Sequence, residues 1–351
     1  MSRILVTGGA GYIGSHTSST LLEANYDICI LDSFINSSPI SLERIQKIHN
    51  IDKNLYKKRV KIFKGDVRDQ KIIERIFESA IQDNNPIEAV IHFAGVKSVE
   101  QSVREPLLYW DINVGGSRNL VEVMDRFNCH KLIFSSSATI YGIPESIPIR
   151  ESAEINPINP YGESKAAVES ILKSLCTSNN KWDIVALRYF NPIGAHPSGL
   201  IGEDPFGTPN NLFPYITQVA SGRLSELKIF GNDWPTKDGT CIRDYIHPLD
   251  LAEGHLAALK YISKENKGDF IALNLGSGNG YSVLDIVSAF EDACGKRLNY
   301  KFTERRPGDV AITIADASKA LEIINWETKR PLSTICKDNW LWQVMNPNGY
   351  E

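Results

Sequence analysis

The feature that most constrains this chain is a glycine-rich segment near its N terminus, VTGGAGYIG at residues 6–14. A short apolar run precedes it, and an apolar pattern with helical spacing follows over residues 13–22. Strand, glycine turn and helix in this order are typical of the first unit of a dinucleotide-binding fold. Gly8 would allow the tight turn, Gly11 the approach of a pyrophosphate, and Gly14 close packing of the helix on the strand. The positive end of that helix and its free N–H groups would then favour phosphate.

Two carboxylates at the ends of predicted strands are candidates for binding the cofactor. Asp32 follows a strand predicted over residues 27–31 and lies 18 residues after Gly14, near the usual offset of about 20 for the residue that binds a ribose diol. Its charge would repel a 2′-phosphate, so the prediction is NAD rather than NADP. Asp66 leaves two interpretations open: an acceptor for the adenine amino group, or the N-cap of a helix over 72–81.

Length and composition limit the class of protein. A chain of 351 residues predicts two domains, and a net charge of −4 offers no basic field for nucleic acid. The six cysteines stand singly, without a C-x-x-C, which fits a reduced compartment and argues against a disulfide framework or a metal site. Neither a secretory signal nor an apolar run of about 18 residues is visible, so we expect a cytoplasmic enzyme without a membrane segment.

Strand and helix patterns alternate along the first part of the chain. Strands are predicted at 4–6, 27–31, 60–63, 89–93, 132–134 and 184–190, and helices at 13–22, 42–51, 72–81, 107–127, 161–176 and 246–261. This alternation predicts an α/β fold with a Rossmann-type doubly wound parallel sheet. We expect an NAD-binding domain over 1–191 and a smaller α/β substrate-binding domain over 192–351. It would begin with a functional loop at 192–212, and a buried strand at 270–276 would return the chain to the sheet.

Tyr161 and Lys165 stand four residues apart, on one face of a predicted helix. A free tyrosine has a pKa near 10 and is a poor base at neutral pH. A neighbouring ammonium and a positive nicotinamide would favour the phenolate, which predicts Tyr161 as the general base. Ser137, at the end of a predicted strand, would orient the substrate alcohol. Ser136 is expected to pack on the backbone or to contact the cofactor.

These motifs resemble the extended short-chain dehydrogenase/reductase family. The blocks HFAGVKSV, RYFNPIGAHPSG, GEDP, PNNL, IFGNDWPTKDGT, RDYIH and RRPGD narrow the resemblance to the UDP-glucose (UDP-galactose) 4-epimerases, over residues 3–351. The resemblance implies that tightly held NAD takes a hydride from C4 of a UDP-hexose while the tyrosine takes the 4-OH proton. The 4-keto sugar then rotates within the site, and the same hydride returns to the opposite face of the sugar ring. A role in galactose metabolism and a homodimer are also implied; apolar residues on several faces of helix 107–127 agree with the homodimer.

The resemblance further implies two sets of binding residues. NAD would contact Tyr12, Ile13, Asp32, Ser33, Phe34, Ile35, Asn36, Ser37, Asp66, Val67, Phe93, Ala94, Gly95, Val96, Lys97, Asn113, Tyr161, Lys165 and Phe190. The nucleotide sugar would contact Lys97, Ser137, Tyr161, Tyr189, Asn191, Asn211, Leu212, Phe230, Arg243, Arg306, Asp309 and Thr313. Phe230 would face the uracil, and two arginine forks would suit two phosphates. The alternative for each arginine is a surface ion pair, for example that of Arg243 with Asp244.

Other functions on the same fold stay open. A sugar-nucleotide dehydratase would carry an Asp-Glu pair directly after the catalytic serine or threonine, where this chain has Ala138 and Thr139, neither a usable proton shuttle. A non-catalytic NAD-binding regulator would be indicated by loss of Tyr161 or Lys165, and both are present. In the epimerases that the chain resembles, a large tyrosine at the position of Thr313 is associated with excluding N-acetyl sugars and a smaller residue with admitting them. Threonine therefore predicts additional activity on UDP-N-acetylglucosamine unless neighbours fill the space.

Overall fold

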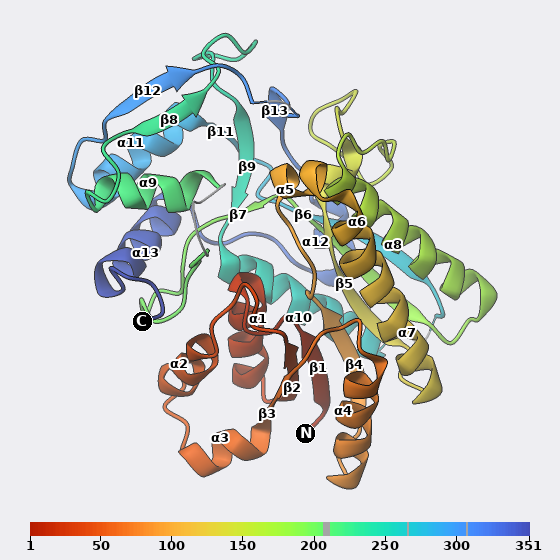
Figure 1. The fold of residues 1–351 in the computed structure, drawn as a ribbon. Coiled ribbons are helices and arrows are strands. Elements are labelled where there is room, and N and C mark those ends of the chain that lie inside the picture. The colour runs from red at the N-terminus through yellow and green to blue at the C-terminus, as the bar shows by residue number, and fades with distance from the viewer. Residues whose placement is uncertain (206–210, 265–266, 307) are drawn as a thin grey trace.

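The chain is organised around a parallel sheet of seven strands in the order β10-β6-β5-β4-β1-β2-β3 (Figure 1). The computed structural model describes residues 1–205, 211–264, 267–306 and 308–351, so residues 206–210 of the predicted loop lie outside the described residues. The strands are β1 (Arg3–Thr7), β2 (Asp27–Asp32), β3 (Val60–Lys64), β4 (Ile87–His92), β5 (Lys131–Ser137), β6 (Asp183–Tyr189) and β10 (Phe270–Leu275). The doubly wound fold class predicted from the sequence is confirmed. The strand order reverses between β1 and β4, and ligands of such sheets bind in the crevice at that point.

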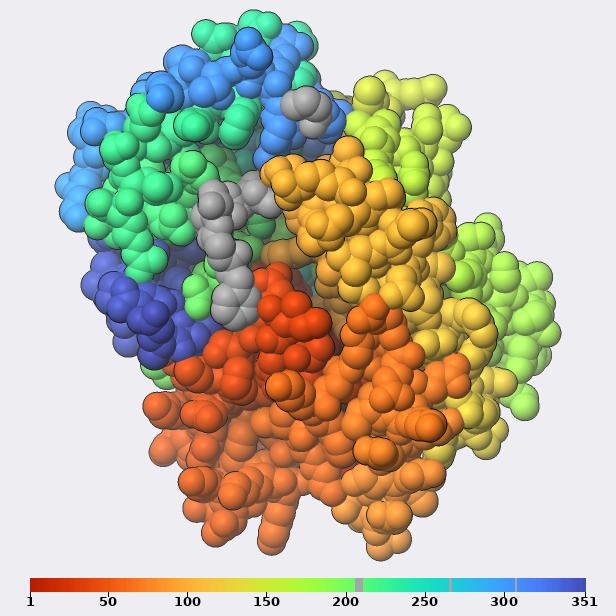
Figure 2. Space-filling view, viewed as in Figure 1, coloured from red at the N-terminus to blue at the C-terminus, as the bar shows by residue number. Residues whose placement is uncertain are grey.

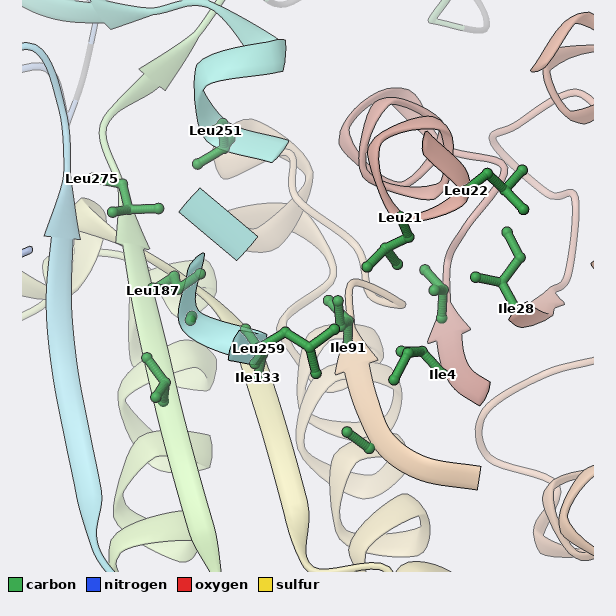
Figure 3. Close-up of a cluster of buried hydrophobic side chains, with 14 of the residues drawn as sticks. Ile4, Leu21, Leu22, Ile28, Ile91, Ile133, Leu187, Leu251, Leu259 and Leu275 are labelled. Carbon is green, nitrogen blue, oxygen red and sulfur yellow. The ribbon is translucent and has the colours of Figure 1, made fainter. Parts of the chain in front are cut away.

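Both faces of the sheet are covered, which explains why its strands are apolar without alternation. Successive side chains of β1 point to opposite faces, so Ile4 and Val6 join one buried cluster and Leu5 joins the other. Figure 3 shows the first cluster, in which Leu21 of one helix and Leu259 of another lie over the same sheet face. The sheet is therefore buried on both faces, and the loops described below follow the carboxyl ends of its strands.

The helices of this part follow the predicted alternation. They are α1 (Tyr12–Glu23), α2 (Ile40–Ile48), α3 (Lys53–Arg59), α4 (Gln70–Gln82), α5 (Val99–Arg104), α6 (Pro106–Tyr109), α7 (Gly116–Arg126), α8 (Pro160–Ser178) and α10 (Pro248–Lys264). The helical pattern predicted over 107–127 is confirmed up to Arg126, with one feature that the pattern did not indicate: a π-helical turn, η1 (Trp110–Gly115), lies between α6 and α7. Such turns are frequent at functional sites. The helix predicted from residue 246 begins at Pro248, since Ile246 ends a strand.

The remaining elements are the strands of two smaller sheets and the helices that accompany them. They are β7 (Asn191–Pro192), β8 (Leu227–Phe230), β9 (Ile242–Ile246), β11 (Gly280–Ser282), β12 (Tyr300–Thr303), β13 (Ile312–Thr313), α9 (Leu212–Ala220), α11 (Val283–Cys294), α12 (Ser318–Ile324), α13 (Leu332–Met345) and the 3-10 turn η2 (Ala138–Tyr141). In Figure 2 their green and blue surface gathers above the red first unit. β10 pairs with β6, so the chain does return to the sheet; the domain division at residue 191 stays a prediction. Among the described residues, no helix has the length and apolarity needed to span a bilayer.

Candidate active site

The glycine-rich loop between β1 and α1 can be built only from glycine at two of its positions. Gly8 has a φ of +70°, and a Cβ there would lie 2.8 Å from the backbone nitrogen of Ala94. A Cβ on Gly14 would lie 2.1 Å from the carbonyl oxygen of Gly8. Gly11 stands at the N-cap of α1, and no side chain caps this helix. The first N–H groups of α1 therefore point out of a tightly wound loop without a side-chain partner, which fits a pyrophosphate.

Asp32 ties the glycine loop to the turn after β2. Its Oδ2 accepts a hydrogen bond from the backbone nitrogen of Ala10 at 2.9 Å, and its Oδ1 accepts from the backbone nitrogen of Phe34 at 2.9 Å and the hydroxyl of Ser37 at 2.8 Å. The carboxylate is buried and keeps lone pairs for further donors. Its local role is thus to hold the loop in shape, in addition to the predicted contact with a ribose.

Asp66 does not cap the following helix, so that interpretation is wrong. The N-cap of α4 is Asp69, whose carboxylate accepts from the backbone nitrogen of Lys71. Asp66 instead binds the guanidinium of Arg68 through two oxygens, at 3.0 and 2.7 Å. That hydrogen-bonded cation lowers the pKa of Asp66. The carboxylate therefore remains ionised and partly exposed, and its contact with an adenine stays a prediction.

Asn113 explains the π-helical turn. Its side chain accepts from the backbone nitrogen of Val96 at 2.8 Å and donates to the carbonyl of Val96 at 3.1 Å and the hydroxyl of Ser164 at 3.0 Å. A Cβ on Gly95 would lie 2.8 Å from the Asn113 oxygen. The widened turn thus brings one buried amide against the loop after β4 and against α8 at once.

The other predicted cofactor residues lie on the loops that follow three strands of the sheet: Ser33, Ile35 and Asn36 after β2, Val67 after β3, and Phe93, Ala94 and Lys97 after β4.

The structure brings Tyr161, Lys165 and Ser137 together where α8 passes the carboxyl end of β5. The Ser137 hydroxyl lies near enough to the Tyr161 phenol to lower its pKa. Lys165 donates from Nζ to the carbonyl oxygen of Ser135 at 2.8 Å, and its ammonium lies 4.9 Å from the centre of the Phe134 ring. Tyr161 and Lys165 are one helical turn apart, so both side chains reach the same strand end.

The electrostatics of this group differ from the sequence-based expectation. Burial raises the pKa of Tyr161, while the Ser137 hydroxyl and the Lys97 ammonium oppose that rise. The expected lowering by Lys165 is wrong for the protein alone, because Lys165 points at a carbonyl and burial itself lowers the pKa of Lys165 to about 8. Lys97 is thus the cation that favours the phenolate. Burial lowers the pKa of Lys97, but the Glu203 carboxylate, 3.0 Å from Nζ, outweighs this and raises it.

Tyr189 ends β6, and Phe190 follows it. The Tyr189 hydroxyl hydrogen-bonds Nε2 of His255, and burial raises the pKa of Tyr189. Phe190 is buried in a cluster with Ile140 and Ala315. These contacts make both side chains part of the wall of the site; their predicted contacts with ligands stay predictions.

A second group of predicted residues lies on β8, β9 and β13. Asp309 joins the two arginines: its Oδ1 is 3.0 Å from Arg306 and 3.9 Å from Arg243. The Arg306 guanidinium lies 5.5 Å from the centre of the half-exposed Phe230 ring. Thr313 pairs in register with Arg243. These contacts form a chain from the Phe230 ring through Arg306, Asp309 and Arg243 to the small residue Thr313. We call this group the wall of β8, β9 and β13.

Asp244 is not the ion-pair partner of Arg243, although both arginines do pair with a carboxylate, that of Asp309. Asp244 is fully buried and accepts from the backbone nitrogens of Ser277, Gly278 and Ala315. Arg243 and Asp244 are neighbours on β9, so their side chains leave the strand on opposite faces. Arg243 is therefore left on the face it shares with Asp309.

Glu203 is a residue that the sequence analysis missed, although it lies in the GEDP block. Its Oε1 accepts from Lys97 at 3.0 Å and from the Nδ2 of Asn211 at 3.1 Å. Asn191 donates to the carbonyl of Asp244 at 3.0 Å, and Leu212 begins α9. One carboxylate thus joins a residue after β4 to a residue before α9.

Comparison with known proteins gives consistent results. Residues 5–339 match the family model described as GDP-mannose 4,6 dehydratase. A UDP-glucose 4-epimerase of Bacillus subtilis is 50% identical over 348 residues, covering 99% of this chain and 98% of that protein. A solved UDP-glucose 4-epimerase of Bifidobacterium longum, in complex with NAD+ and UDP, has a TM-score of 0.92 and 45% identity, covering 99% of this chain and 100% of that one. A UDP-Glc/GlcNAc 4-epimerase of Campylobacter jejuni has a TM-score of 0.82 and 34% identity, covering 98% and 100%.

Proposed function

Because the chain belongs to the UDP-glucose 4-epimerases within the GDP-mannose 4,6-dehydratase family, we propose that it interconverts UDP-galactose and UDP-glucose with tightly bound NAD. One observation carries the proposal: Tyr161, Ser137 and Lys165 converge at the carboxyl edge of the sheet, beside a glycine loop shaped for a pyrophosphate. The same proposal places the protein in galactose metabolism and in the cytoplasm. It also assigns residues 1–191, completed by α10 and β10, to binding the cofactor.

The fit to a dinucleotide rests on the chain's own atoms. Gly8 and Gly14 leave no room for side chains, and α1 begins without a cap. When bound, the nicotinamide supplies the acceptor and then the donor of the C4 hydride. Tyr161 then takes the 4-OH proton and later returns it, with Ser137 orienting the hydroxyl. The Lys97 ammonium opposes the rise that burial causes in the pKa of Tyr161. The phenol therefore loses its proton more readily and is a better base.

The nucleotide part of the substrate would occupy the wall of β8, β9 and β13. Arg243 and Arg306 are held side by side through Asp309, and two guanidinium forks match the oxygens of a diphosphate. Phe230 is 40% exposed, so part of its side chain remains accessible for a contact with a uracil. This wall would hold UDP while the hexose reaches Tyr161.

A dehydratase on this fold is the competing function, as the name of the family model suggests. The residues after Ser137 argue against it. Ala138 has no ionisable group, and the Thr139 hydroxyl donates to Ser137 at 2.9 Å. Without a carboxyl pair there, the chain has no acid and base at that place to expel a 6-hydroxyl.

The test is to incubate the purified protein with UDP-galactose and identify the product by NMR. We expect UDP-glucose as the sole new product, in equilibrium with the remaining UDP-galactose. A 4-keto-6-deoxy sugar would indicate a dehydratase, and no turnover would indicate a regulator, so either result would reject the proposal.

Activity on N-acetylated sugars is a second candidate function. Thr313 is a small, half-buried residue next to Arg243 in the β9–β13 pair. No aromatic ring therefore occupies this position, and an acetamido group would meet less overlap. The similarity to the Campylobacter jejuni enzyme, which is named for both sugars, supports turnover of UDP-N-acetylglucosamine as well.

A homodimer is proposed from exposed apolar side chains around the π-helical turn. Leu107 is 81% exposed, Val103 64% and Trp110 41%. Large apolar residues that gather on one surface commonly mark an interface. A second copy of the chain would cover them.

A further inference from the structure

Helix α8 is fixed to the end of β5 at three points rather than one. Tyr161, Lys165 and Glu169 follow at intervals of four residues and so share one face of the helix. Each contacts one of three consecutive strand residues. In the first contact, the Tyr161 phenol lies near the Ser137 hydroxyl, which lowers the pKa of the phenol. The other two contacts are hydrogen bonds: the Lys165 ammonium donates to the Ser135 carbonyl at 2.8 Å, and the Ser136 hydroxyl donates to the Glu169 carboxylate at 2.5 Å. Ser136 is therefore turned toward the helix and not toward a cofactor.

The third contact belongs to a buried ion pair. Arg188 on β6 binds Glu169 through both carboxylate oxygens, at 3.0 and 2.6 Å, and both side chains are only 4% exposed. Arg188 also donates to the Tyr141 hydroxyl at 2.9 Å, which donates in turn to Asn274 of β10 at 2.7 Å. One charge pair thus connects α8 with three strands of the sheet.

Stability alone does not account for such a pair. A buried ion pair is often no more stabilising than apolar side chains of the same volume, because desolvation offsets the attraction. A two-point guanidinium–carboxylate contact does impose a definite geometry. The pair lies two turns along the helix from Tyr161, where a small rotation or slide of α8 would move the phenol relative to Ser137.

We propose that Glu169 is a positioning residue for the reaction, held by Arg188 so that Tyr161 stays opposite Ser137 and a carboxylate stays near the Lys165 ammonium. The proposal rests on the proposed epimerase function. Glu169 touches neither substrate nor cofactor, and acts through the two side chains that precede it on the same helix face.

The charge of Glu169 has a consequence that a purely structural pair would lack. Burial lowers the pKa of Lys165 to about 8, and the Glu169 carboxylate opposes this. The other titratable groups near these residues are uncharged near pH 7 or already paired. They are His92 of β4, whose pKa burial lowers to about 3, the buried phenols of Tyr141, Tyr161 and Tyr189, whose pKa values burial raises, and Arg188 and Lys97, which pair with Glu169 and Glu203. Without the carboxylate, Lys165 would lose its proton at lower pH.

The test compares turnover and its pH profile in Glu169→Gln and in the double variant Glu169→Gln/Arg188→Met. The double variant avoids an unpaired buried arginine and keeps the test valid if the single variant does not fold. We expect kcat to fall by about 10- to 100-fold, the range for a small displacement of a catalytic group, with KM within about threefold because the UDP wall is unchanged. The basic limb of the kcat profile should move to lower pH. Glu169→Asp keeps the charge, so it should lose turnover without that shift.

A control removes a second ion pair, in which the carboxylate is fully buried and the arginine is partly exposed. Arg330→Gln separates Arg330 from the fully buried Asp250 of α10 and should lower stability without moving the pH profile. If folded Glu169 variants keep the wild-type kcat and pH profile, the positioning role is refuted while the epimerase function stands. If the wild type itself does not epimerise UDP-galactose, the proposed function fails first, and the role of Glu169 fails with it.

Discussion

Gly14→Ala perturbs the glycine loop at the position where the added atom would come closest to the backbone. The new Cβ would lie 2.1 Å from the carbonyl oxygen of Gly8 and 2.8 Å from the Cα of Gly9. Ordinary contact begins near 3.4 Å, so helix and loop must separate by about 1 Å, and strain of this kind costs about 1–3 kcal/mol. Alanine lowers the entropy of the unfolded chain, which returns about 0.4–1 kcal/mol. We therefore expect a net loss of about 1–2 kcal/mol in the free energy of unfolding.

The same displacement should weaken NAD binding. It moves the first N–H groups of α1 away from the pyrophosphate, and a hydrogen bond to a charged group contributes about 1.5–3 kcal/mol. Losing one such bond raises the Kd for NAD at least about tenfold. Retained cofactor is measured after acid release, the Kd by titration calorimetry, and stability by urea unfolding.

Gly115→Ala is the matched control. Gly115 has helical backbone angles, and a Cβ there would meet nothing closer than 3.8 Å. We expect it to gain about 0.4–1 kcal/mol and to retain NAD like the wild type. Wild-type stability together with wild-type NAD affinity in Gly14→Ala would refute the assignment of this loop to the pyrophosphate.

Four further predictions concern single side chains. Tyr161→Phe should fold and keep NAD but lose at least about a hundredfold in turnover; near-normal turnover would remove Tyr161 as the base. Asp32→Ala should raise the Kd for NAD and relax discrimination against NADP, and wild-type protein that co-purifies with NADP would contradict the assignment. Thr313→Tyr should abolish activity on UDP-N-acetylglucosamine and spare UDP-glucose; undiminished N-acetyl activity would show that Thr313 is not the gate. Leu107→Glu should convert the expected dimer into a monomer by light scattering, a prediction that fails if the wild type is already monomeric at micromolar concentration.

The parts of the fold that the sequence predicts are those with short-range causes. The Rossmann sheet follows from apolar strands alternating with helices, and the glycine spacing marks the first turn because Gly8 and Gly14 have no sterically allowed substitute. Tyr161 and Lys165 could be paired because helical spacing alone puts them on one face. Each of these features depends on residues within a few turns of one another.

Other features depend on contacts between distant segments. The π-helical turn follows from Asn113 reaching both Val96 and Ser164, which no local period records. The N-cap of α4 is Asp69 rather than Asp66, and two aspartates three residues apart compete for that position with similar propensities.

Ion pairs between residues that are distant in the sequence could not be predicted from it either. Glu169 meets Arg188 across 19 positions and Glu203 meets Lys97 across 106; neither pair leaves a pattern in the sequence. The partner of Arg243 was an avoidable error, because adjacent residues of a strand face opposite ways.

The central claim is that one hydride leaves C4 of the sugar and returns to the same carbon without contact with water. The direct measurement follows UDP-galactose deuterated at C4 through turnover by the wild-type protein, without added cofactor, with the product analysed by mass spectrometry and NMR. A hydride held by a bound cofactor does not exchange with solvent, so we predict that UDP-glucose keeps the deuterium at C4. Loss of the label to water, or accumulation of reduced cofactor in place of UDP-glucose, would contradict the proposed mechanism.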